Sequence, residues 1–500
     1  MRSALRDLAI VLGAAWIARA AFVVLIGDVH SVDVHYWQAA LAALDQGRNP
    51  YELGVLNWPP LWLVVIAAID WVANVLGIAF WSALRVYLVL VESALVVTLY
   101  VTLLRLGAER IAVRRALLVG IALNPVAIIL VCQHGNSDVQ VGLLVTLTVA
   151  ALAAHQRSRD IAAWLGACLL LGVGVLAKTV PLVLVPLLAP GARRASGTAR
   201  ILGAALFLGP AAFGTAVILV LAPSAVWDNV ITYHSTRGFF GLAGMVRDFA
   251  VLDVRFAAVT LVTALVLVGV ALAARARRPL TVGAAVLLAE IAVTVCVLWL
   301  VEGADRFSLL DARAHYATVF TLALAGGIAA AFVVLWRGTP LAAPRLFLAA
   351  AVGLMLLVAF GPGYGPQYAY WFLPALVATY VLLDDSWRRL LQVAWLVAAA
   401  TYGLEYALID YLGAWAVAVF GGSGTWLAEV GDYLTTPHHL VVFRLPLYAV
   451  YLVLIAAGIE RLVGRDDPAA AGAPVCDTVK PNGSLRSGVA NAGTTSRPEA

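Results

Sequence analysis

Long apolar runs separated by short arginine-bearing turns constrain this chain more than any other feature. The first run, Leu8 to Ile26, follows Arg2 and Arg6, and similar runs recur as far as Arg465. Hydrophobic residues make up 63% of the sequence and charged residues 12%, whereas soluble domains carry roughly 25% charged residues. Because a membrane-spanning helix needs about 20 apolar residues, the sequence predicts an all-α polytopic membrane protein with about 12–14 transmembrane helices.

Arginines indicate the orientation of the spans, because short cytoplasmic loops are enriched in Lys and Arg. Arg2 and Arg6 place the N-terminus in the cytoplasm, and the first span is expected to remain as an anchor. The later arginine-bearing turns also lie on the cytoplasmic side if Leu61–Ile78 does not cross the membrane. Asp70 and Asn74 within it favour an outer juxtamembrane or re-entrant helix. Both termini are therefore expected in the cytoplasm.

The chain is expected to divide at residue 465. Residues 1–465 form the predicted transmembrane domain. Residues 466–500 are rich in Ala, Gly, Pro, Ser and Thr without periodicity, which is typical of a disordered tail. The arginines are scattered over short loops, so nucleic-acid binding is not expected. The four cysteines have no zinc-site spacing.

Polar residues gather on the side opposite to the arginine turns. The segment Asp28–Pro60, in the outer loop 28–82, is the longest polar break in the first hundred residues. The other polar outer segments are Cys132–Asp138, Lys178, Tyr233–Gly238, Glu302–His315 and Gly361–Tyr368. Seven of the eight histidines fall on this face. The sequence therefore predicts a site at the extracytoplasmic boundary of the membrane.

The residue types on this face suit transfer between a lipid-borne phosphate compound and a hydroxylated acceptor. Asp33 is the candidate general base for the attacking hydroxyl. Lys178, Arg237 and Arg85 are the candidates for holding the donor phosphate and its departing charge. Sugar or acceptor contacts are assigned to polar and aromatic residues, namely His35, Tyr36, His134, Asn136, Asp138, His234, Gln367 and Tyr368, with Trp37 and Trp371 as further aromatic candidates.

Ordered motifs over roughly residues 1–380 carry a family resemblance. They are Asp33-x-x-Tyr36, Gly47-Arg48-Asn49-Pro50-Tyr51, Trp58-Pro59-Pro60-Leu61, Asn124-Pro125 with Gln133-His134-Gly135-Asn136-Ser137-Asp138, Lys178-x-x-Pro181, and Gly365-Pro366-Gln367-Tyr368-x-Tyr370-Trp371-x-x-Pro374. This set resembles GT-C glycosyltransferases, above all the polyprenyl- or dolichyl-phosphate-mannose-dependent mannosyltransferases.

The resemblance implies a GT-C-like fold and an inverting single displacement. A hexose, most often mannose in this family, would move from a polyprenyl-phosphate donor to a glycolipid or glycan acceptor outside the membrane, with Asp33 as the base. Some relatives carry a metal-linked Asp-x-Asp pair in this loop. Here the nearest acidic neighbour is Asp28, so no metal or other cofactor is expected.

Several alternatives remain open for single residues. Asp33 could cap a helix over Val34–Leu44, or join His30 and His35 in a divalent-metal site, which is not favoured. Lys178 could extend to the interface without binding phosphate. Asp138 could cap the next span. Trp58, Trp62 and Trp371 are typical of an interfacial aromatic belt.

The alternative for the whole chain is a transporter or lipid-linked sugar flippase. Such proteins usually place ionisable groups near the bilayer midplane and show internal repeats. No repeat is found, and Glu92 is the acidic residue that lies deep in the early spans. These observations favour the transferase.

Overall fold

The structure, a computed structural model, describes residues 2–28, 30–221, 223–226, 309–361, 366–383, 385–406, 429 and 437–463. The chain forms two compact units, Met1–Leu462 and Val463–Ala500. Nearly all described residues belong to the first unit. The predicted cytoplasmic tail, 466–500, lies outside the described residues.

Helices account for every regular element in these ranges, and no strand occurs among them, as predicted for an all-α protein. The α-helices are α1 (Arg2–Ile26), α2 (Val32–Asp45), α3 (Pro60–Leu76), α4 (Phe80–Arg105), α5 (Arg110–Leu117), α6 (Pro125–Ile129), α7 (Asp138–Ser158), α8 (Ile161–Ala177), α9 (Ala189–Arg194), α10 (Gly197–Leu221), α11 (Pro223–Val226), α15 (Leu309–Arg337), α16 (Ala343–Phe360), α17 (Ala369–Leu382), α18 (Asp385–Tyr406) and α21 (Pro437–Val463). Shorter 3-10 or π turns are η1 (Pro50–Leu53), η2 (Leu118–Ala122), η3 (Leu130–His134), η4 (Val180–Leu188) and η7 (Pro366–Tyr368).

Five helices of the described chain are long and apolar enough to cross a membrane: α1, α4, α7, α10 and α16. A sixth candidate is the broken pair Arg110–Ala122 and Pro125–His134, whose halves meet at 48°. Shorter apolar helices include α3, α8 and α17. Much of the sequence expected to supply further spans, 227–308 and 407–436, lies outside the described residues.

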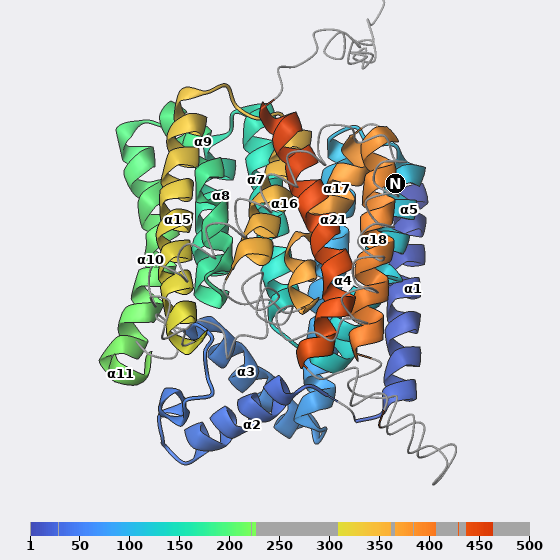
Figure 1. The fold of residues 1–500 in the computed structure, drawn as a ribbon, viewed down its shortest axis with the longest axis vertical. Helices are drawn as coiled ribbons and strands as arrows, with labels where there is room; N and C mark the ends of the chain where they lie inside the picture. The colour runs from blue at the N-terminus through green and yellow to red at the C-terminus, as the bar shows by residue number, and fades with distance from the viewer. Residues whose placement is uncertain are drawn as a thin grey trace, which may run out of the picture. The chain divides into compact units, whose positions relative to one another are not determined.

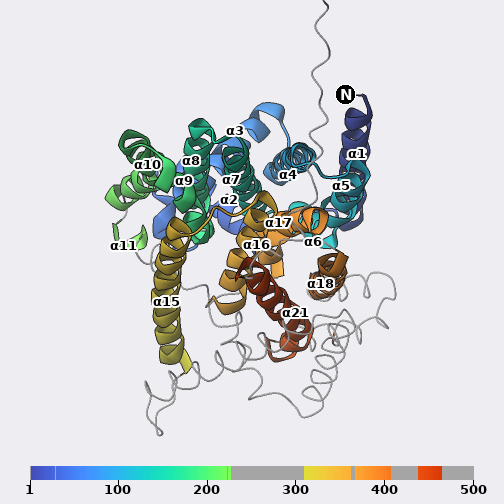
Figure 2. The same ribbon diagram turned by 90° about the horizontal axis from the view of Figure 1, so that it is seen from above.

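Helix α7 lies at the centre of the packing. It contacts α4, α8, α16 and α17, and its apolar window is the most buried of the five candidate spans. Helix α10 then packs along the outer side of α8, as Figures 1 and 2 show. Gly172 permits this approach, because a Cβ there would lie 2.3 Å from the backbone oxygen of Phe207.

Arginine-bearing turns that the structure describes lie at one end of the helix bundle. Figure 1 shows the N-terminus and α9 at that end and α2 and α3 at the other. Asp7 of α1 pairs with Arg110 at 3.0 Å and with Arg114 at 2.9 Å. Arg193 of α9 donates to the carbonyl of Trp336 at the end of α15, at 2.8 Å. Turns far apart in sequence therefore meet, as the arginine pattern predicts.

The first loop folds into two helices that lie across the opposite end (Figure 1). The segment Leu61–Ile78, expected to be an outer juxtamembrane or re-entrant helix, forms α3, which is shorter than the candidate spans. Trp58 and Trp62, which were predicted for an aromatic belt, are instead buried against Trp37. The ring centroid of Trp37 lies 5.7 Å from that of Trp58 and 5.2 Å from that of Trp62. The three tryptophans form the core between α2 and α3 because burying an indole yields more than leaving it at an interface.

Candidate active site

The loop from His134 to Asp138 begins where the broken span ends. Asn124 breaks the span: its side chain accepts from the amide of Val126 at 2.9 Å and so starts α6. The second half ends in η3, and Gly135 turns the chain with a φ of +64°. A Cβ at Gly135 would lie 2.3 Å from the ring of Trp81. Only glycine fits this turn.

Groups of the first loop bind the carbonyls at the end of η3. Ser31 donates its amide to the carbonyl of Gln133 at 3.1 Å and its hydroxyl to the carbonyl of His134 at 2.8 Å. Arg85 donates from Nε to the carbonyl of Cys132 at 2.8 Å and from Nη2 to the carbonyl of Gly27 at 2.9 Å. These bonds satisfy the last carbonyls of the half-span, and they fix the first loop against it.

Ser31 is also the N-cap residue of α2, so Asp33 falls in the first turn of that helix. Its carboxylate is therefore near the positive end of the helix dipole. The expected cap by Asp33 of a helix starting at Val34 is wrong: the helix starts two residues earlier, at Val32.

The carboxylate of Asp33 meets two side chains of the His134–Asp138 loop. Oδ2 of Asp33 lies 3.1 Å from Nε2 of His134 and accepts from Nδ2 of Asn136 at 2.8 Å. Asn136 is itself oriented by the hydroxyl of Ser137, which donates to its Oδ1 at 3.0 Å. The Asp33 side chain is 20% exposed, and among the described residues its Oδ1 has no hydrogen-bond partner. One carboxylate oxygen is thus held, and the other has no partner in the part of the chain that the structure describes.

Lys178 and Asp138, the last residue of the His134–Asp138 loop, form a second polar cluster. Lys178 follows the end of α8, and its Nζ donates to Oδ1 of Asp138 at 2.6 Å. Nε1 of Trp371 donates to the same oxygen at 2.7 Å. The ammonium also lies 5.0 Å from the ring centroid of Tyr368 and 4.9 Å from that of Trp371, and the two rings stack at 4.1 Å. Lys178 is therefore held by a carboxylate and two aromatic faces rather than extended to an interface.

The two clusters are joined by a very short piece of chain. Asn136 contacts Asp33 and Asp138 contacts Lys178, and the two loop residues are separated by Ser137 alone. Two consecutive peptide units span at most about 7 Å. The Asp33 carboxylate and the Lys178 ammonium consequently contact the same short loop, although they come from sequence positions far apart.

Other predicted site residues lie differently. Arg85 is buried, and its guanidinium is held by two carbonyls and by the ring of Trp81, whose centroid is 4.3 Å from Cζ. His35 and Tyr36 are exposed on α2, and Gln367 is half-buried in η7. His234 and Arg237 lie outside the described residues.

The residues weighed for a metal site do not converge on one point. His30 and His35 pack edge to face with ring centroids 4.5 Å apart, and His30 also contacts Trp81 at 5.4 Å. Asp33 is turned towards His134 instead. Within the part of the chain that the structure describes, no group of three His, Cys, Asp or Glu side chains is placed to hold a metal ion.

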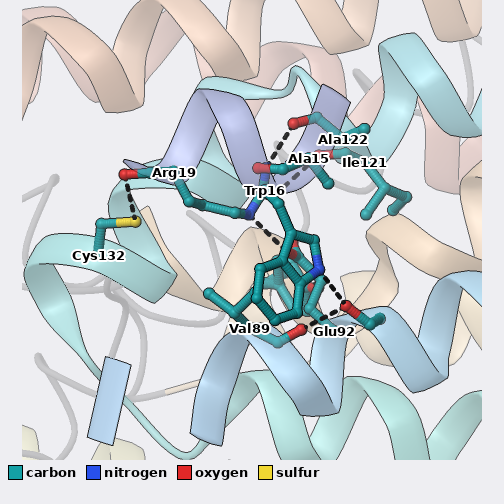
Figure 3. A network of polar contacts seen from close by, with 10 residues as sticks. Ala15, Trp16, Arg19, Val89, Glu92, Ile121, Ala122 and Cys132 are labelled. Atoms are coloured by element: carbon teal, nitrogen blue, oxygen red, sulfur yellow. Dashed lines mark hydrogen bonds and ion pairs between the residues drawn. The ribbon is translucent and has the colours of Figure 1, made fainter. Parts of the chain in front are cut away.

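Two residues that matter here are missing from the sequence interpretation. Ser31 connects the two loops. Arg19 lies inside the first apolar run and pairs with Glu92 of α4, with Nε 2.6 Å from Oε2 (Figure 3). The sequence did contain a signal for Arg19, because a charged side chain within a membrane span is energetically unfavourable unless other groups bind it.

Comparisons with known proteins give fold-level likeness. A scan against protein-family models finds no match, and a search of curated proteins finds none. Two crystal structures of ArnT from Cupriavidus metallidurans are similar, each at 16% sequence identity. The one bound to undecaprenyl phosphate aligns with a TM-score of 0.45 over 93% of this chain and 78% of that chain. The apo structure aligns with a TM-score of 0.42 over 92% and 77%. At this level the likeness assigns neither an activity nor a substrate.

Proposed function

We propose that the chain is an integral membrane glycosyltransferase that moves a hexose from a polyprenyl-phosphate donor to the hydroxyl of an extracytoplasmic acceptor. One observation carries the proposal. Asp33 is held through Oδ2 by His134 and Asn136 while its Oδ1 has no hydrogen-bond partner among the described residues, and Lys178 is bonded to the same loop. A general base and a phosphate-binding cation are the two groups that such a transfer needs.

The proposed reaction is a single displacement. The acceptor hydroxyl gives its proton to Oδ1 of Asp33 as its oxygen bonds to the anomeric carbon of the sugar. The bond between that carbon and the phosphate oxygen breaks, and the electron pair leaves with the polyprenyl phosphate. Attack opposite to the leaving group inverts the anomeric centre. His134 and Asn136 fix the carboxylate so that no reorientation is needed during the proton transfer.

Lys178 is proposed to bind the donor phosphate. An ammonium has three N–H donors, and in this structure one of them is directed at Asp138. The Lys178 side chain is 16% exposed whereas Asp138 is fully buried, so the remaining donors are those that an incoming phosphate can reach. Asp138 and Trp371 would keep the ammonium in place while it takes up the charge that develops on the leaving phosphate. Arg85 is left out of this role, because its donors are directed at carbonyls.

The alternative, a transporter or flippase, would need charged groups within reach of its cargo. The buried ion pair of Arg19 and Glu92 does not offer this. The three guanidinium nitrogens face two carboxylate oxygens and three backbone carbonyls. Both side chains are 2% exposed. The pair is closed, whereas the Asp33 site is open.

The identity of the sugar and the place of the reaction are further parts of the proposal. Mannose is the first candidate because it is the commonest sugar among the enzymes that the motifs resemble. His35, Tyr36, Asp138, Gln367, Tyr368 and the undescribed His234 and Arg237 stay candidates for sugar, acceptor or phosphate contacts. The enzyme would lie in the cell membrane with both termini in the cytoplasm and the site outside, would need no cofactor, and would use a glycolipid or glycan as acceptor.

A transfer assay tests the proposal. Membranes containing the protein would receive radiolabelled polyprenyl-phosphate mannose, glucose or galactose, and label would be measured in the lipid and glycan fractions. Asp33→Asn should lower transfer by about 10³-fold, within the range known for general bases. Asp45→Asn, on the exposed last turn of the same helix, should leave transfer unchanged. Undiminished transfer by Asp33→Asn would refute the assignment of the base. Movement of labelled lipid across the membrane without sugar transfer would favour the flippase.

A further inference from the structure

The break in the span before the site leaves two backbone carbonyls without their helical donors. Pro125 has no N–H, so the carbonyl of Ile121 lacks the donor that an α-helix supplies four residues later, and its backbone donor is instead the amide of Asn124 at 3.3 Å. The amide of Val126, which would bond the carbonyl of Ala122, is turned to the side chain of Asn124 at 2.9 Å. Carbonyls freed inside a membrane-spanning segment must find other donors.

Arg19 supplies those donors from α1. Nη2 donates to the carbonyl of Ile121 at 3.3 Å, and Nη1 donates to the carbonyl of Ala122. Nη1 also donates to the carbonyl of Ala15 in its own helix, at 3.1 Å. Figure 3 shows the guanidinium reaching from α1 to the corner of the broken span.

Glu92 holds the guanidinium in that position. Its Oε1 accepts from Nη2 of Arg19 at 2.6 Å, and its Oε2 lies 2.6 Å from Nε. The hydroxyl of Tyr370, on α17, donates to Oε1 at 3.3 Å. The corner is therefore tied to α1, α4 and α17 through a single pair of charges.

The half-span that starts at this corner ends at the candidate site. Residues 125–134 run from the corner through α6 and η3 to His134, without another break. The thiol of Cys132 donates back to the carbonyl of Arg19 at a Sγ–O distance of 3.8 Å. A tilt of the half-span at its corner would displace His134 and Asn136 from Asp33.

We propose that Arg19 and Glu92 are positioning residues for the base: they fix the corner at Ile121–Ala122 and thereby set His134 and Asn136 against Asp33. This role rests on the proposed function of Asp33. It differs from a general contribution to stability, because the pair acts on one half-span and not on the packing of α7, α8 and α10.

Alkylation of two native cysteines tests the placement without any assay of activity. Cys132 lies on the half-span and Cys168 on α8, and both are buried free thiols. In Arg19→Gln, maleimide labelling of Cys132, measured by peptide mass spectrometry, should become about 10-fold faster, while the rate for Cys168 stays within about 2-fold of wild type. Equal acceleration at both cysteines would indicate general loosening and would overturn the proposal, as would no change at either.

Kinetics test the consequence for the site. Arg19→Gln and Glu92→Gln should lower kcat by about 10–100-fold, since a displacement of about 1 Å can cost 10² in rate. The KM for the donor should stay within about 2-fold, because Asp138, which holds Lys178, is the first residue of α7 and not part of the half-span. Arg19→Lys should recover part of kcat, whereas the exchange Arg19→Glu with Glu92→Arg should not, since a carboxylate cannot donate to the corner carbonyls.

Ser93→Ala is the matched control. Ser93 follows Glu92 and accepts from Nε1 of Trp16 at 3.0 Å, so it joins the same two helices, and no hydrogen bond among the described residues links it to the corner. It should leave kcat and both labelling rates unchanged. A loss of kcat in Ser93→Ala equal to that in Arg19→Gln would overturn the proposal. If Asp33→Asn keeps full activity while Cys132 still becomes reactive in Arg19→Gln, the role of Asp33 fails but the structural link stands.

Discussion

Asp33 and Glu92 each belong to a polar cluster at the broken span. Among the described residues, their carboxylates differ in how many oxygens have a hydrogen-bond or ion-pair partner. Both oxygens of Glu92 face Arg19, and the pair is 2% exposed. Of the two oxygens of Asp33, one is held and the other has no hydrogen-bond partner within the described ranges, and the side chain is 20% exposed. Buried charges must be paired to be tolerated, so the closed cluster suits a fixed support. An incompletely satisfied carboxylate at an accessible position suits a reaction.

The sharpest test of this contrast compares stability. Glu92→Ala leaves the guanidinium of Arg19 buried without its counter-charge, and breaking a buried pair in this way costs about 3–5 kcal/mol. Asp33→Asn should change the free energy of unfolding by less than about 1 kcal/mol, as is usual outside the core. Thermal unfolding in detergent, followed by tryptophan fluorescence, would measure both. Equal losses would remove the distinction between the two clusters.

A further prediction concerns the second polar cluster, that of Lys178 and Asp138. Lys178→Ala should lower kcat/KM for the donor by about 10²-fold, as for the loss of one electrostatic donor at an active site. This variant also leaves Asp138 buried and uncompensated, so the double variant with Asp138→Asn should recover stability. The double variant should not recover kcat/KM. Recovery of both would mean that Lys178 serves only to neutralise Asp138.

A smaller effect is expected from the groups that hold Asp33. Asn136→Ala removes the donor at 2.8 Å from Oδ2 and should lower kcat by about 10-fold, since hydrogen bonds to charged groups are worth about 1.5–3 kcal/mol. Combined with Asp33→Asn, it should cause no further loss, because residues that act as a unit are not additive. Additive losses in the transfer assay would mean that Asn136 does not act through the carboxylate of Asp33.

The smallest effect concerns the first loop, away from both clusters. The hydroxyl of Tyr51 donates to the carbonyl of Trp58 at 3.1 Å, and burial raises the pKa of Tyr51. Tyr51→Phe should cost about 1 kcal/mol at neutral pH. A raised pKa means that wild-type stability falls once the pH passes about 10, where an unfolded tyrosine ionises. The variant should lose less stability over that interval, as denaturant titrations at two pH values would show. An equal loss in the variant and the wild type would mean that ionisation of Tyr51 does not contribute to the fall in stability.

The sequence predicted the helical class and the grouping of the arginine turns, because hydropathy and loop charge follow directly from residue type. It also predicted that Asp33, His134, Asn136, Asp138 and Lys178 share one face. It did not predict which of these residues touch. The pairing of Asp33 with His134 depends on the 48° bend and on the bonds of Ser31, which are properties of tertiary packing.

Arginine was the residue type hardest to interpret. Arg85 was expected as a candidate for binding the donor phosphate, and in the structure its Nε and Nη2 donate to the carbonyls of Cys132 and Gly27. Arg19 was passed over because it stands alone in an apolar run. In both cases some of the acceptors are backbone oxygens, which every residue carries and which leave no mark in a sequence.

Gly135 has a consequence for how such chains can vary. Its φ of +64° and the ring of Trp81, 2.3 Å from where a Cβ would lie, exclude every other residue. A homologue that kept Asp33, His134 and Asn136 but replaced Gly135 would retain each reactive group and lose their arrangement. A search for relatives that weighs only acids, bases and cations would accept such a chain. Including Gly135 together with Trp81 would separate chains that can assemble the site from chains that only carry its parts.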